Sequence, residues 1–171
     1  LAHKWGLSSA LNTSRFIGAE GWTSSHLTGD GDSGISAEHN YTCAVSLKGS
    51  NKTINGVTFE GASGTGGTGW QITAGMTSAH NSQTSTVGGQ IGAMLSNGMR
   101  YAGDPQKIKV SGLTPGKSYV FTLYNQAWEA SGREATLSCS ELSATITLNQ
   151  SQYGSSSQDG LLVNCSYTAS G

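Results

Sequence analysis

Charged residues are scarce in this chain of 171 residues: only 11% are Asp, Glu, Lys or Arg, and the formal net charge is −1. Such a surface has little to attract nucleic acid or an anionic membrane, so neither is expected as a partner. No apolar run approaches the roughly 20 residues that a transmembrane helix needs, so membrane insertion is not expected either.

Catalytic signatures are also lacking. The sequence contains no Gly-x-Ser-x-Gly and no His-Glu-x-x-His motif, and its four histidines are scattered. A glycosidase needs two carboxylates about 5–10 Å apart, and the glutamates show no pattern that suggests such a pair. We therefore expect a protein that is not an enzyme.

Glycine is abundant, with 25 residues, and Ser and Thr are frequent. This composition suits short strands joined by many turns and opposes long helices. At this length one core suffices, because folding buries roughly 70% of the unfolded chain's surface. We expect residues 1–171 to form a single domain and a monomer. Since the chain begins with Leu1, we also expect it to be part of a larger protein, secreted or exposed on a cell surface.

The clearest strand signal follows a turn at Pro115-Gly116, where proline presets φ and glycine supplies the next residue of the turn. Tyr119, Phe121 and Leu123 then share one face at period two. Similar signals predict strands at about 41–48, 53–59, 70–75, 107–113, 117–127, 133–140, 143–149 and 160–169. The first forty residues look irregular, apart from a candidate strand at 15–17.

Two further local signals refine this pattern. Asn55-Gly56 predicts either a tight hairpin turn or a bulge within one strand. Ile91, Met94 and Leu95 fall at helical spacing, which predicts a short helix at 89–97 that Asn97-Gly98 ends. The predicted fold is all-β: a two-sheet antiparallel jelly-roll sandwich with one short helix.

The three cysteines, Cys43, Cys139 and Cys165, each lie on the apolar register of an alternating segment. They are either buried thiols that act as small hydrophobic side chains, or, for Cys139 and Cys165, partners in a disulfide between neighbouring strands or facing sheets. A metal site is not expected of them, because there is no Cys-x-x-Cys pair and no His at ligand spacing.

Asp30 and Asp32 lie one residue apart in a polar, glycine-rich loop at residues 28–35. Two such carboxylates can coordinate a structural Ca²⁺ together with backbone carbonyls, if Glu38, Asn40 or other oxygens complete the shell. The alternative is a tight turn in which the carboxylates accept hydrogen bonds from nearby backbone amides. Both interpretations remain open from sequence.

Two tryptophans lie in loop-like contexts. Trp22 follows Gly21, and Trp70 ends a glycine-rich loop. An exposed indole can stack on the apolar C–H face of a sugar ring, so both are candidate ligand-binding residues. The alternative is that both rings pack in the core.

A second candidate site lies between two predicted strands, at Asn125, Trp128, Glu129 and Arg133. The amide, carboxylate and guanidinium can hydrogen-bond to neighbouring sugar hydroxyls beside an indole that stacks. Alternatively, Glu129 pairs with Arg133 across the turn and Trp128 closes the end of the sandwich.

Three segments together resemble a known type of module: residues 28–35, residues 53–59, and the turn and strand at 113–124 with Trp128-Glu129 and Arg133. They are similar to a poorly characterised jelly-roll module of large secreted or surface-anchored bacterial proteins, many of which act on polysaccharides. That module resembles the galactose-binding-like carbohydrate-binding modules. The resemblance implies a non-catalytic β-sandwich that holds a structural calcium and binds glycan.

The sequence therefore favours a carbohydrate-binding module that holds a parent enzyme or surface protein near polysaccharide. The alternative is a structural or adhesive spacer domain of a bacterial surface protein. Exposed indoles would favour the first hypothesis, and four buried indoles would favour the second.

Overall fold

The computed structural model describes residues 20–80, 84–97, 99–126, 133–150 and 159–170. These residues belong to two compact units. Unit 1 contains the described residues up to Leu27 together with those of the segment 118–170, and unit 2 is Thr28–Lys117. That the whole chain is a single domain stays a prediction.

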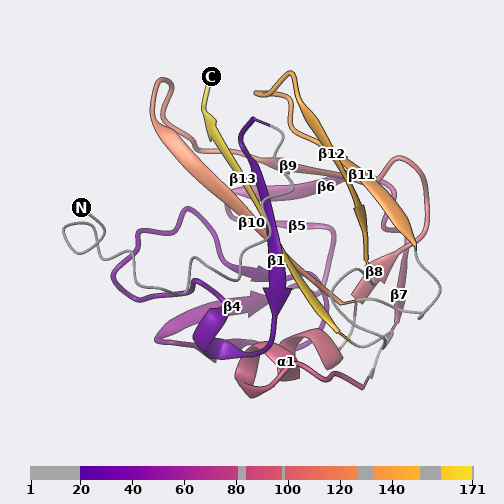
Figure 1. The fold of residues 1–171 in the computed structure, drawn as a ribbon. Coiled ribbons are helices and arrows are strands. Elements are labelled where there is room, and N and C mark those ends of the chain that lie inside the picture. The colour runs from indigo at the N-terminus through magenta and orange to yellow at the C-terminus, as the bar shows by residue number, and fades with distance from the viewer. Residues whose placement is uncertain (1–19, 81–83, 98, 127–132, 151–158, 171) are drawn as a thin grey trace. The chain divides into compact units, whose positions relative to one another are not determined.

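The main sheet of unit 1 has three antiparallel strands in the order β1-β13-β10. Figure 1 shows β13, in yellow, between β1, in indigo, and β10. Because the central strand comes last in the chain, its neighbours lie far from it in sequence. The strands are β1 (Trp22–Leu27), β10 (Ser118–Gln126) and β13 (Gly160–Thr168).

The second sheet of unit 1 is the antiparallel pair β11 (Glu134–Ser138) and β12 (Thr145–Asn149). Its inward side chains pack with those of the main sheet in one hydrophobic cluster. The buried members of the cluster are Trp22, Ile146, Leu148, Leu161, Val163 and Cys165. Phe121, Leu123 and Tyr167 pack against it while partly buried, as the period-two pattern of their strands predicts.

Unit 2 consists of shorter elements that form three small groups of strands, in the orders β2-β4-β3, β5-β6-β9 and β7-β8. All these pairs are antiparallel except β2 with β4, which is parallel. The elements are η3 (Asp30–Asp32, a 3₁₀ turn), β2 (Val45–Ser46), β3 (Lys52–Ile54), β4 (Val57–Gly61), β5 (Gly66–Gly67), β6 (Trp70–Ala74), β7 (Ser78–His80), α1 (Gly89–Ser96), β8 (Met99–Tyr101) and β9 (Lys107–Val110).

The hairpin alternative at Asn55-Gly56 is confirmed. Ile54 pairs with Val57 across the turn, and both central residues have positive φ, 47° for Asn55 and 83° for Gly56. Such a turn matches the twist of two antiparallel strands, and Asn-Gly is the dipeptide that adopts it most readily. The predicted helix is also confirmed, since α1 buries Ile91 and Met94 on one face.

The described chain is mostly β, with one short α-helix, and its strands form several small sheets and no closed barrel. A jelly-roll sandwich stays a prediction, and the candidate strand at 15–17 lies outside the described residues. The prediction that the first forty residues are irregular is wrong at β1. None of the helices in the described part of the chain has both the length and the hydropathy that crossing a bilayer would demand.

Candidate functional site

Asp30 caps a helix that begins 59 residues further along the chain, at Gly89. Its two carboxylate oxygens accept hydrogen bonds from the backbone N–H groups of Gln90 (3.0 Å) and Ile91 (2.8 Å). These are two of the donors that the first turn of a helix leaves without intrahelical partners. The residue that precedes α1 is Gly88, which has no side chain to do this. Asp30 supplies the missing cap, and its negative charge suits the positive end of the helix dipole.

Asp32 closes the turn that holds Asp30 in place. Its carboxylate accepts hydrogen bonds from the Thr28 hydroxyl (2.7 Å) and from the backbone N–H groups of Thr28 and Gly29. Partial burial by itself raises the pKa of Asp32, but these hydrogen bonds outweigh it and hold the pKa below its ordinary value of 3.8. The carboxylate is therefore charged at neutral pH, where it stabilises the turn.

Asn55 links the Asp turn to the β3–β4 hairpin. Its side-chain amide donates to the backbone carbonyls of Asp30 (2.8 Å) and Ile35 (3.1 Å). Ser33, which is almost fully buried, donates its hydroxyl to the same Asp30 carbonyl at 2.7 Å. The segment is thus a junction between a 3₁₀ turn, a hairpin and the start of α1.

These contacts bear directly on the predicted calcium site. Both carboxylates face N–H groups, whose partial positive charge opposes a cation at the same oxygens. Among the described residues, no cluster of three or more His, Cys, Asp or Glu side chains is arranged to hold a metal ion. Asp32 matches the turn alternative, because its carboxylate accepts hydrogen bonds from nearby backbone amides. Asp30 differs from it, because its carboxylate accepts from the distant start of α1. Calcium binding by Asp30 and Asp32 stays a prediction.

The two described indoles lie in the interior and not on open surfaces. Trp22 is 5% exposed, belongs to the core cluster of unit 1, and donates its indole N–H to the Ala144 carbonyl at 3.0 Å. Trp70 is 7% exposed and lies against Gly67, where an added Cβ would stand 2.7 Å from the indole nitrogen. Both indoles match the alternative that they pack in the core, and sugar binding by Trp22 and Trp70 stays a prediction.

The candidate site between β10 and β11 is only partly within the described residues. Asn125 is half-buried near the end of β10, where it pairs with Leu161. Arg133 is exposed just before β11, and its carbonyl accepts the Gln150 N–H at 2.8 Å. Trp128 and Glu129 lie outside the described residues, so binding at this segment stays a prediction.

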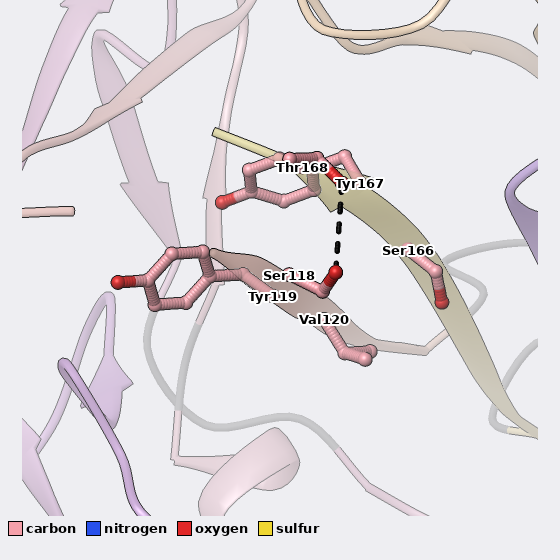
Figure 2. A pocket seen from close by; sticks show the side chains of 6 residues that line it. All are labelled: Ser118, Tyr119, Val120, Ser166, Tyr167 and Thr168. Carbon is pink, nitrogen blue, oxygen red and sulfur yellow. Dashed lines mark hydrogen bonds between the residues drawn. The ribbon is translucent and has the colours of Figure 1, made fainter. Parts of the chain in front are cut away.

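A different aromatic site emerges at the beginning of β10, where it pairs with the end of β13. A depression of about 440 Å³ is lined by Ser118, Tyr119, Val120, Ser166, Tyr167 and Thr168. Figure 2 shows the two tyrosine rings projecting to the same side of the strand pair, and Val120 and Ser166 to the other. The ring centroids lie 6.2 Å apart with a tilt of 30°, because Tyr119 and Tyr167 are opposite residues in the antiparallel register.

Polar groups lie on both faces of this strand pair. The hydroxyls of Ser118 and Thr168 lie 3.5 Å apart across the strands, on the face opposite the two rings. Partial burial, the neighbouring thiols of Cys139 and Cys165, the Glu141 carboxylate and Tyr119 all raise the pKa of Tyr167. Its phenol therefore stays neutral at physiological pH and can both donate and accept a hydrogen bond.

Sequence reasoning missed this pair. Tyr119 and Tyr167 were both recognisable as residues on the apolar register of their strands, but their contact depends on the pairing of β10 with β13. The signal was present in the ends of the two strands, Ser118-Tyr119 and Tyr167-Thr168, each of which has a tyrosine next to a residue with a hydroxyl group, in opposite order.

Comparisons with known proteins add no identification. No protein-family model, no curated protein and no solved structure matches this chain.

Proposed function

We propose that this protein is a carbohydrate-binding module, and that Tyr119 and Tyr167 form its sugar-contacting surface. The observation that carries the proposal is the pair of partly buried tyrosine rings, each with a phenol group, on one face of the β10–β13 pair. A sugar presents apolar C–H groups on its ring faces and hydroxyls around its edge. Aromatic rings stack on the former, and the phenol groups of Tyr119 and Tyr167 hydrogen-bond to the latter.

The size and charge of this surface fit the proposal. A volume of about 440 Å³ lies within the range of small-ligand sites. An uncharged phenol such as that of Tyr167 also suits a neutral glycan better than an anionic ligand. Binding at such a shallow site is weak, since a few contacts must offset the cost of ordering ligand and side chains. Tethering to a larger protein then raises the effective concentration of substrate near that protein.

The test is affinity electrophoresis through gels that contain neutral polysaccharides, followed by a glycan array. The Tyr119→Ala protein is expected to bind the retained glycan about 5- to 10-fold more weakly, as expected for the loss of one aromatic contact. Tyr101→Ala is the matched control, because Tyr101 is 46% exposed on β8, in the other unit. Equal binding by Tyr119→Ala would exclude the proposed site. A folded wild-type protein that no glycan retains would exclude the function.

One observation favours a second candidate, a structural or adhesive spacer domain. Trp22 and Trp70 are both buried, as that hypothesis requires of all four indoles. Acrylamide quenching separates the two functions further. Weak quenching of the total tryptophan fluorescence, together with no glycan binding, would favour the spacer. A jelly-roll arrangement is compatible with either function, and the packing of the two sheets of unit 1 in one cluster supports it.

A further inference from the structure

Two of the three cysteines meet inside unit 1. Cys165 lies within β13, where it pairs with Trp22 on β1 and with Phe121 on β10, and it is 2% exposed. Cys139 follows the last residue of β11 and packs against the same hydrophobic cluster while only partly buried. A residue within one sheet and a residue that follows a strand of the other sheet therefore contact the same hydrophobic cluster. The two thiols lie close enough for Cys139 to raise the pKa of Cys165.

The backbone holds this contact firmly. Cys165 has a hydrogen-bonded strand on each side, so its side-chain direction is fixed by the register of the sheet. Cys139 begins a turn in which its carbonyl accepts the Leu142 N–H at 3.1 Å, and Leu142 itself packs against the cluster. These constraints keep both side chains at the same hydrophobic cluster, where a disulfide can form if the two sulfur atoms reach bonding geometry.

The two thiols differ in how readily they react. Burial, and the hydrogen bond and charge of the neighbouring Cys139, raise the pKa of Cys165 to about 12. Cys165 therefore seldom becomes a thiolate while Cys139 is reduced. Cys139, which is half-buried, is the thiol that an external reagent reaches first.

We propose that Cys139 and Cys165 are a disulfide-forming pair, oxidised by thiol–disulfide exchange with an external disulfide such as that of an oxidoreductase or oxidised glutathione. The Cys139 thiol loses its proton, and the thiolate attacks one sulfur of the reagent, which releases the other sulfur as a thiolate. The Cys165 sulfur then loses its proton and attacks Cys139 in the mixed disulfide. One protein disulfide forms, and the reagent leaves as two thiols, so two electrons and two protons have been transferred.

Oxidation would join the β11–β12 sheet to the β1-β13-β10 sheet by a covalent bond. The bridge would enclose a loop of about 26 residues, which restricts the unfolded chain and so favours the folded state. Such a pair suits an oxidising compartment, in agreement with the expectation that the protein is secreted. This inference does not depend on sugar binding.

Cys43 provides an internal control. It lies in unit 2, is half-buried, and burial raises the pKa of its thiol. The Cys43→Ser protein is therefore expected to form the same disulfide as the wild type, and the Cys139→Ser protein none.

The experiment is refolding of the full chain from urea in a buffer of reduced and oxidised glutathione, followed by alkylation, peptide mapping and thermal unfolding. Refolding exposes every thiol to the reagent, so burial cannot hide a negative result. We expect one peptide pair joined through Cys139 and Cys165, one alkylated thiol at Cys43, and a Tm about 10 °C above that of the protein treated with dithiothreitol.

The Tm difference should persist in Cys43→Ser and vanish in Cys139→Ser. Three alkylated thiols, mixed disulfides with glutathione alone, or a bridge that includes Cys43 would each overturn the proposal.

Discussion

Replacing Asp30 with alanine tests whether this carboxylate is a helix cap or a metal ligand. The change removes the acceptor of two backbone N–H groups, at 3.0 Å from Gln90 and 2.8 Å from Ile91. The hydrogen bond to the partly buried Ile91 N–H is the more costly of the two to remove. A hydrogen bond to a charged group contributes about 1.5–3 kcal/mol to stability. Removing a helix cap typically costs about 0.5–2 kcal/mol. We expect a loss of about 2 kcal/mol.

For a chain of this size, that loss lowers Tm by about 4–8 °C. The measurement is thermal unfolding by circular dichroism in a buffer that contains a calcium chelator, with hydrogen exchange of the α1 amides as a local readout. Asp30→Asn keeps a neutral acceptor oxygen, so its loss of stability should be about half that of Asp30→Ala. Glu38→Gln is the control, because Glu38 is exposed and is one of the residues that a calcium shell would recruit.

The two interpretations diverge clearly. If Asp30 is a cap, Asp30→Ala is destabilised without calcium and Glu38→Gln is unchanged. An Asp30→Ala protein as stable as the wild type in chelator would refute the capping argument. If calcium also raised the Tm of the wild type but not the Tm of Asp30→Ala, Asp30 would instead be assigned as a metal ligand.

Two further predictions concern the same junction. Because the pKa of Asp32 is lowered in the folded state, its contribution to stability is present above the usual value of 3.8 and is lost as the pH falls through the lowered pKa. The difference in Tm between wild type and Asp32→Asn should therefore shrink below about pH 4. A difference in Tm that grows on acidification would contradict this prediction. Gly89→Ala should destabilise the protein by at least about 1 kcal/mol, because Gly89 has φ +73° and an added Cβ would stand 2.5 Å from the Asp30 carboxyl carbon. Urea unfolding measures this loss of stability. The control is Gly31→Ala, because a Cβ added at Gly31 meets nothing within 4 Å.

Strands with strict alternation were predictable because one face packs on a core. β10, β12 and β13 lie within two residues of their expected bounds for this reason. β1 was missed because its pattern is broken: Ser24 is 2% exposed on a buried position where an apolar side chain would be expected. The expected strand at 41–48 shortens to β2, because Tyr41 is exposed and its hydroxyl bonds to the backbone of Ser36.

The candidate sites were harder to predict than the strands. A turn at Asp30 follows from local chemistry, but its bond to Ile91 spans 61 residues and depends on the fold. The absence of a capping side chain before α1, at Gly88-Gly89, was the local sign that a distant residue must supply one. The Tyr119–Tyr167 and Cys139–Cys165 contacts likewise depend on which strands become neighbours. Residue type and period alone do not decide that.

The position of β13 at the centre of its sheet constrains the order in which the chain can fold during synthesis. β1 is made early, but its hydrogen-bonding partner is the last strand described, and all of Thr28–Lys117 is made between them. Unit 2, whose pairings are all internal, is complete on the emerging chain well before unit 1 can close. Until Gly160–Thr168 leaves the ribosome, β1 and β10 have no strand between them, and a nascent chain truncated before that segment would leave both exposed to aggregation.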